Sequence, residues 1–169
     1  NSRNSINKQL ATFATRHMDG FDIQIVNLND YEMPIYGIDR EKENGIPALA
    51  SHFKEHIQSA DGIIISFAEH NGAYSTAFKN VLDWVSRLGG SVWDDKPMFL
   101  MATSPGGRGG KSVLELATNS FKHMTKGAIN NFSLPSFNAN FSKEQGITDE
   151  RLLASFQQQL NNFKDTLGN

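Results

Sequence analysis

The stretch from residue 98 to residue 124 limits the possible folds most, because patterns typical of a strand, a turn and a helix follow one another there. The apolar run Met98–Thr103 predicts a buried strand, and apolar residues at helical spacing predict a helix over Ser112–Met124. Between them stands Ser-Pro-Gly-Gly-Arg-Gly-Gly, residues 104–110. Such a turn exposes backbone N–H groups at a helix N-terminus, where an anion or the polar edge of a ring can bind.

The same alternation of strand and helix runs through the whole chain. Strands are predicted at Asp22–Leu28, Ile63–Phe67, Pro97–Thr103 and Ala128–Leu134. Helices are predicted at Ser5–His17, from Pro47 through Ile57, from Phe78 to the Gly89-Gly90 pair, at Ser112–Met124 and around Leu152–Phe163. We therefore expect one α/β domain over residues 1–169, a doubly wound, mostly parallel sheet with helices on both faces. Residues 29–45 are expected to form a long loop.

The start of the series lacks a strand. It opens with a loop and a helix, whereas a doubly wound sheet places its first strand near the centre. We therefore expect an apolar strand of about five residues before Asn1, missing from this sequence. The alternative is a four-stranded sheet that begins with a helix.

Composition narrows the class of protein. The chain has 169 residues and a net charge of −2, which gives no reason to expect nucleic acid or an anionic membrane surface as a partner. No apolar run is long enough to cross a bilayer. The absence of Cys excludes disulfides, thiolate catalysis and Cys-ligated metals, and fits a reducing compartment. We expect a cytoplasmic protein without a metal site.

Two further loops carry polar residues suited to a ligand. Ser2, Arg3, Ser5 and Asn7 stand just before a predicted helix and offer hydroxyls, an amide and a guanidinium to a phosphomonoester. Alternatively, Ser2, Asn4 or Ser5 simply caps that helix. Residues 68–75 contain the turn dipeptide Asn71-Gly72, followed by Tyr74. This loop can wall a flat ring, or it is an ordinary strand-to-helix connection with Trp84 as a core or interface residue.

These three motifs, in this order, resemble the NADPH-dependent FMN reductases of the flavodoxin-like fold, which include quinone, azo-dye and chromate reductases. The resemblance covers essentially the whole chain. It rests on Ser2, Arg3, Ser5, Asn7, Glu69, Asn71, Gly72, Tyr74, Lys79, Asn80, Asp83, Trp84 and the complete segment Ser104–Gly110. The second loop departs from the family pattern at Ala68, His70, Ala73, Ser75 and Thr76. Loss of two Pro and one Gly predicts a looser or reshaped loop. His70 is either a titrating group near the flavin or an exposed loop residue.

The resemblance implies an oxidoreductase that moves hydride from NADPH or NADH to FMN and then to a small-molecule acceptor, with no catalytic side chain. It implies that Ser2, Arg3, Ser5 and Asn7 hold the FMN phosphate. One side of the ring system would be lined by Glu69, His70, Asn71, Gly72 and Tyr74. The pyrimidine edge would meet Ser104, Pro105, Gly106, Gly107, Arg108 and Gly109. Two other readings stay open: a flavodoxin-type electron carrier without a nicotinamide site, and a structural or regulatory domain without flavin.

The helix Ser75–Leu88 suggests an oligomer. Trp84 stands beside the apolar stripe from Phe78 to Val85, and a face this wide can serve both a core and a partner. We expect a homodimer or a homotetramer built from dimers.

Overall fold

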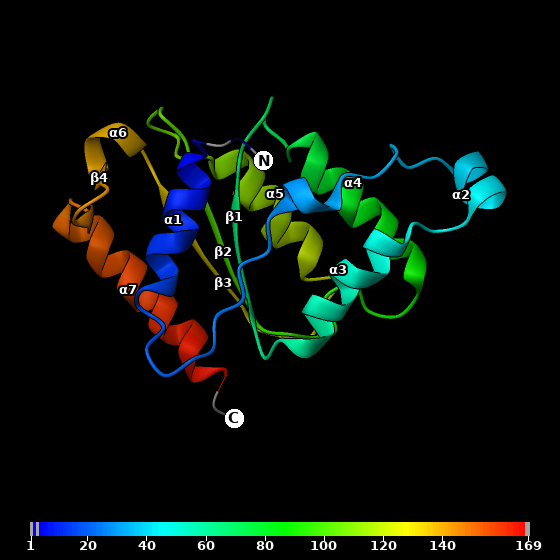
Figure 1. Ribbon diagram of the computed structural model, residues 1–169. Helices are drawn as coiled ribbons and strands as arrows, with labels where there is room; N and C mark the ends of the chain where they lie inside the picture. The colour runs from blue at the N-terminus through cyan, green and yellow to red at the C-terminus, as the bar shows by residue number, and fades with distance from the viewer. Residues whose placement is uncertain (1, 3, 168–169) are drawn as a thin grey trace.

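A parallel sheet of three strands forms the centre of the molecule (Figure 1). The computed structural model describes residue 2 and residues 4–167. Its sheet consists of β1 (Ile63–Phe67), β2 (Met98–Thr103) and β3 (Ile129–Leu134), in that order. Ile63 lies opposite Met98, which lies opposite Ile129. Three of the four predicted strands are therefore confirmed, and β1 has the predicted bounds.

Helices cover both faces of this sheet (Figure 1). On one face lie α1 (Ile6–Thr15) and α7 (Glu150–Asp165); on the other lie α4 (Thr76–Val85) and α5 (Lys111–Phe121), with α3 (Ala48–Ser59) packed against α4. The predicted helices are thus confirmed, with ends shifted by a few residues. A parallel sheet with helices on both faces gives the predicted three-layer α/β/α arrangement.

The central strand β2 explains why both layers are needed. All six of its residues are buried. Phe99 and Met101 pack among α1 and α7, whereas Met98, Leu100 and Ala102 pack toward α4 and α5. Alternate side chains of a strand point to opposite faces, so a continuous apolar strand requires a cover on each side.

The predicted strand Asp22–Leu28 is wrong. Residues 22–27 pair with no strand, and the 3₁₀ helix η1 begins at Leu28 and ends at Tyr31. A strand exists only when its backbone bonds to a neighbour, and β1 bonds only to β2 within the described residues. Ile23 and Ile25 consequently stay 38% and 61% exposed. If residues 22–28 paired directly with β1, no room would be left for the strand that we expect before Asn1. Within the described residues this pairing is absent, so the strand before Asn1 stays a prediction.

The expected loop 29–45 contains a short helix besides η1. This helix, α2 (Ile38–Asn44), projects at the edge of the molecule (Figure 1). Arg87 in the 3₁₀ helix η2 (Ser86–Leu88) pairs with Glu41 of α2 at 2.9 Å. After β3 come α6 (Phe137–Asn140) and a small hairpin of β4 (Phe141–Ser142) and β5 (Gly146–Ile147).

The apolar stripe of α4 is covered by the chain itself. Trp84 is 1% exposed, and its indole Nε1 donates to the carbonyl of Pro34 at 2.7 Å. The amide of Asn80 donates to the carbonyls of Met33 and Pro34 and accepts from the N–H of Tyr36. The expectation that Trp84 and its stripe offer a partner surface is therefore corrected: these residues belong to the core.

Candidate functional site at the carboxyl ends of the strands

The side chain of Asn7 fastens the start of α1 to the carboxyl ends of two strands. Its amide oxygen accepts from the N–H of Thr103 at 3.0 Å and from the hydroxyl of Ser66 at 2.8 Å. Its amide nitrogen donates to the carbonyl of Thr103 at 3.1 Å. Asn7 is 5% exposed. The side-chain amide of Asn7 is therefore engaged inside the protein, where it positions the start of α1, and its contact with the FMN phosphate stays a prediction.

The first loop delivers its polar residues at the N-terminus of α1. Ser5 is the N-cap, and its Oγ accepts from the N–H of Lys8 at 3.1 Å. The capping alternative therefore holds for Ser5, whose hydroxyl hydrogen remains available as a donor. Ser2 is exposed and its carbonyl accepts from the N–H of Ser5. Arg3 lies outside the described residues.

The second loop is a tight hairpin. His70 and Ala73 exchange two backbone hydrogen bonds of 3.0 Å across the turn. Asn71 and Gly72 have φ values of +53° and +78°, the left-handed conformation that a two-residue hairpin turn needs. Hydrogen bonds between His70 and Ala73 thus close this loop, and a loop looser than or reshaped from the family pattern stays a prediction. His70, Asn71 and Gly72 are exposed at its tip.

Glu69 and Tyr74, on either side of this hairpin, point into the protein. The carboxylate of Glu69 accepts from the N–H of Val113 at 3.0 Å, in the first turn of α5. It thereby caps a helix N-terminus that lacks a side-chain cap of its own. The ring of Tyr74 packs against Phe67, Phe78 and Phe121, and burial raises the pKa of its hydroxyl to about 12.

The glycines of the third loop divide into two pairs. A Cβ on Gly109 would come within 2.6 Å of the Ser133 hydroxyl, and one on Gly110 within 2.9 Å of Ala102. Both also have positive φ. By contrast, a Cβ on Gly106 meets nothing within 4 Å, and one on Gly107 meets only the Ser136 hydroxyl at 4.0 Å. Close packing therefore requires glycine at positions 109 and 110, whereas the space beside Gly106 and Gly107 is open.

Three backbone donors of this loop have no acceptor among the described residues. Among the described residues, no protein acceptor takes the N–H of Gly106, Gly107 or Arg108. The carbonyl of Gly106, in contrast, accepts from the N–H of Ser136 at 2.9 Å and from that of Gly109 at 3.2 Å. The loop is therefore held through its carbonyl while its N–H groups remain available to a ligand.

The remaining residues of the loop support its shape. The carbonyl of Ser104 accepts from the N–H of Phe137 at 3.0 Å, and the guanidinium of Arg108 donates to the hydroxyl of Ser112 at 2.9 Å. Pro105 is exposed. Two residues that sequence reasoning missed are Ser66 and Ser136; the former binds Asn7, and the latter has an unusual φ of +47°. Ser66 could have been recognised from the sequence, because it is a polar residue inside the apolar run of β1.

A family comparison agrees with this arrangement of three loops. The family model of NADPH-dependent FMN reductases matches residues 1–141. The chain belongs to the NADPH-dependent FMN reductase family. The earlier resemblance is thereby confirmed, and Asn7, Asn80, Trp84 and Gly109 of the motifs now have structural roles in this member of the family.

Several individual relatives of this FMN reductase family member are named quinone reductases. A 2-hydroxy-1,4-benzoquinone reductase from a Burkholderia species is 38% identical over 109 residues, which are 63% of this chain and 57% of that protein. An NADPH:quinone oxidoreductase from Arabidopsis thaliana is 30% identical over 140 residues, 79% of this chain and 70% of that protein. The chain thus spans little more than half the length of the first of these relatives.

A solved structure shows the same fold. FerB, a flavoenzyme NAD(P)H:(acceptor) oxidoreductase from Paracoccus denitrificans, superimposes with a TM-score of 0.77 over 99% of this chain and 92% of its own, at 22% identity. Within the described residues, no helix is long and apolar enough to cross a membrane, and no three metal-binding side chains gather.

Proposed function

We propose that this member of the family is an FMN-dependent NAD(P)H oxidoreductase with a small-molecule acceptor of the quinone class. The observation that carries the proposal is the open space beside Gly106 and Gly107, in a loop of which three backbone N–H groups have no acceptor among the described residues. This space lies where the loops after β1 and β2 meet the start of α1, held together by Asn7 and Glu69. Glycines that packing does not require fit a flat ring lying against the main chain.

In this proposal FMN, when bound, supplies the hydride chemistry. The chain's own residues would position the FMN ring and polarise it. The N–H groups of Gly106, Gly107 and Arg108 donate to the pyrimidine edge and stabilise negative charge there. The hairpin tip at His70–Gly72 limits access to one side of the ring. No side chain acts as a general base.

The phosphate is proposed to bind at the N-terminus of α1. Ser2, Arg3 and the hydroxyl of Ser5 would donate to it, together with the first N–H groups of the helix. Removing the Arg3 guanidinium by Arg3→Ala is expected to weaken FMN about ten- to a hundredfold. Riboflavin, which lacks the phosphate, should bind both proteins equally. Equal losses for both ligands would place Arg3 away from the phosphate.

The decisive experiment compares two substitutions in the glycine loop. Gly107→Val adds a branched side chain to open space, so the thermal unfolding midpoint should stay near wild type while FMN binding and both half-reactions are lost. Gly109→Val is the control, since it should lower the unfolding midpoint through its clash with Ser133. A Gly107→Val protein that binds FMN normally would contradict the proposed ring position.

The kinetic pattern tests the reaction itself. Because one exposed flavin face would serve both substrates in turn, NAD(P)H and a quinone should give parallel double-reciprocal lines, the ping-pong pattern. Rapid bleaching of the bound flavin by NADPH is expected. A yellow protein that NADPH does not bleach would instead be an electron carrier, and a protein that binds no FMN would be a structural or regulatory domain.

We also propose a homodimer, or a tetramer of dimers, in the cytoplasm. Since the α4 stripe is internal, the supporting surface is now Ile35 and Ile38, which are 67% and 48% exposed and flank Tyr36, whose N–H donates to Asn80. Exposed aliphatic side chains close together favour a partner surface. Ile35→Asp should shift light scattering toward the monomer, whereas Leu116→Asp, at a residue that is 41% exposed on α5, should not. A monomeric wild type would contradict this proposal.

A further inference from the structure

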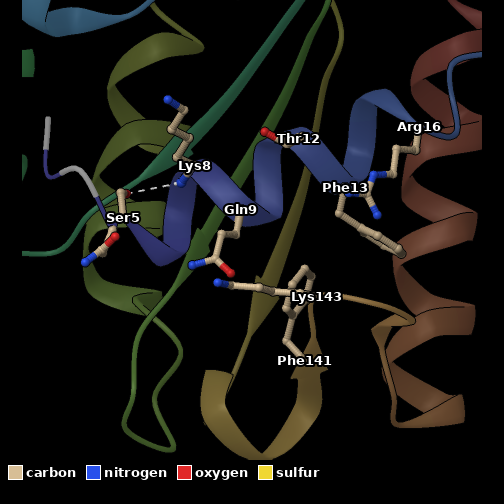
Figure 2. A pocket seen from close by; sticks show the side chains of 9 residues that line it. Ser5, Lys8, Gln9, Thr12, Phe13, Arg16, Phe141 and Lys143 are labelled. Carbon is tan, nitrogen blue, oxygen red and sulfur yellow. Dashed lines mark hydrogen bonds between the residues drawn. The ribbon is translucent and has the colours of Figure 1, made fainter.

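A pocket of about 340 Å³ lies between α1 and the β4 hairpin, apart from the open space at the glycine loop (Figure 2). Its lining includes three cationic side chains, Lys8, Arg16 and Lys143, and two aromatic rings, Phe13 and Phe141. The other lining residues are uncharged and polar, and no described acidic residue lines it. The volume lies within the range of roughly 300–1,000 Å³ typical of small-molecule sites.

The aromatic walls are fixed by packing. The rings of Phe13 and Phe141 meet edge to face with centroids 5.7 Å apart. Phe141 also stacks on Phe137 at 4.7 Å. Phe13 is 5% exposed and lies directly over Gly146, where a Cβ would overlap its ring. The hairpin is therefore shaped to hold these two rings, and the pocket exists before any ligand binds.

The three cations have no side-chain partner among the described residues. Within the part of the chain that the structure describes, the side chains of Lys8, Arg16 and Lys143 make no ion pair or hydrogen bond, although four ion pairs form elsewhere. Lys8 and Arg16 stand two turns apart along α1, and Lys143 approaches from the hairpin (Figure 2). Like charges that share a pocket repel one another, so an anion bound among them would be favoured.

We propose that this pocket binds a phosphorylated ring compound of the adenosine phosphate class. The guanidinium of Arg16 and the ammonium group of Lys143 would bind the phosphate by charge-assisted hydrogen bonds. Lys8, two turns away along α1 (Figure 2), would add to the positive potential of the pocket. The ring of Phe141, which is partly exposed, would contact the ligand ring, and the buried Phe13 would support Phe141 from behind. The side chains of Gln9 and Thr12, which also line the pocket, offer donors and acceptors to the ribose or the base.

This site goes beyond the proposed oxidoreductase function, although the two adjoin. The pocket starts at Ser5, where the flavin phosphate is proposed to bind, and continues along α1 to Arg16. Two sources have the required chemistry: a free adenosine phosphate, or the phosphorylated adenosine end of NADPH. Both share a phosphate ester beside an adenine ring, and NADH lacks the 2′-phosphate.

The test is isothermal titration with adenosine 2′-phosphate, inorganic phosphate and adenosine, using protein alone and protein saturated with FMN. Adenosine 2′-phosphate should bind with one site per chain in both cases and more tightly than either fragment. Arg16→Ala and Lys143→Ala should each weaken it about fivefold, the upper range for an exposed charge contact. Lys42→Ala, an exposed lysine on α2, should leave the affinity unchanged.

Two results would overturn the proposal. If saturating FMN abolishes binding of adenosine 2′-phosphate, the pocket is part of the flavin site. If the double variant Arg16→Ala, Lys143→Ala binds like wild type, the cations do not form a site. A protein that fails to bind FMN would contradict the proposed function, but the titration with adenosine 2′-phosphate would still test this pocket.

The source of the ligand is decided by the KM values of these variants. A rise in KM for NADPH but not for NADH identifies the coenzyme as the source, whereas an unchanged ratio of the two KM values identifies a free nucleotide.

Discussion

At the scale of single residues, Asn7 shows how one buried amide can hold the start of a helix against the ends of two strands. It makes three hydrogen bonds to Ser66 and Thr103. Asn7→Ala should lower the free energy of unfolding by about 2–3 kcal/mol, since each bond contributes roughly 1 kcal/mol and the Thr103 groups are left unpaired. Urea denaturation without any flavin measures this. Asn162→Ala, exposed on α7, should change stability by less than about 0.5 kcal/mol. Similar stabilities for both variants would contradict the positioning role.

His17 gives a second prediction at this scale, on pH. Burial, with Lys164 nearby, lowers the pKa of His17 in the folded protein. The unfolded chain, with a His pKa of about 6.5, then binds more protons than the folded chain below that pH. Stability should therefore fall as the pH drops from about 6.5 toward the lowered value. His17→Phe keeps the ring contacts with Phe13 and Phe156 and should flatten this part of the curve. An unchanged pH dependence would exclude His17 as its cause.

Single residues also mark where sequence reasoning about the site stopped. The sequence identified the three loops and the positions Asn7 and Glu69, because residue types and spacing are visible there. It did not reveal that Asn7 binds strand ends or that Glu69 caps α5. The hydrogen-bond partners of Asn7 and Glu69 are 96 and 44 residues away in sequence, and they are brought together by the packing of the layers. A local sequence pattern cannot predict such distant partners.

At the scale of elements, the cap that Glu69 gives α5 couples the second loop to the third. Glu69→Ala should destabilise the protein by about 1 kcal/mol even without FMN, the usual loss for a helix N-cap. Glu69→Gln keeps an oxygen acceptor and should lose less. Thermal unfolding of flavin-free protein measures both. If Glu69→Ala affects stability only when FMN is present, the carboxylate acts on the flavin instead of on α5.

The elements that sequence reasoning found and missed differ in one physical respect. The strands β1, β2 and β3 are apolar runs buried between two layers, so their pattern is visible locally. Residues 22–28 have a similar composition but lack a backbone neighbour within the described residues, and composition cannot supply one. The helix α2 was missed because its seven residues are mostly charged and bury nothing, so no apolar periodicity marks it.

At the scale of the whole molecule, the sheet is unevenly enclosed. The central strand β2 is fully buried, whereas four of the five residues of β1 are only partly buried. Within the described residues, the second edge of β1 has no strand partner. The unpaired segment that follows α1 carries four apolar residues that are each more than a third exposed: Phe21, Ile23, Ile25 and Val26. An open apolar edge of this kind favours self-association.

This uneven enclosure leads to a prediction about a longer chain. Five β-branched or aromatic residues ahead of Asn1 should add a strand that pairs with β1, because its free N–H and C=O groups gain partners and apolar surface becomes covered. The extended chain should unfold at a higher temperature and show less aggregation by light scattering than a chain extended with five Gly and Ser residues. Hydrogen exchange should slow at Ile63–Phe67 in the first chain only, since the ladder protects the backbone of β1. Equal exchange and equal unfolding temperatures for the two extensions would show that the β1 edge accepts no strand and would favour the alternative of a sheet that begins with a helix.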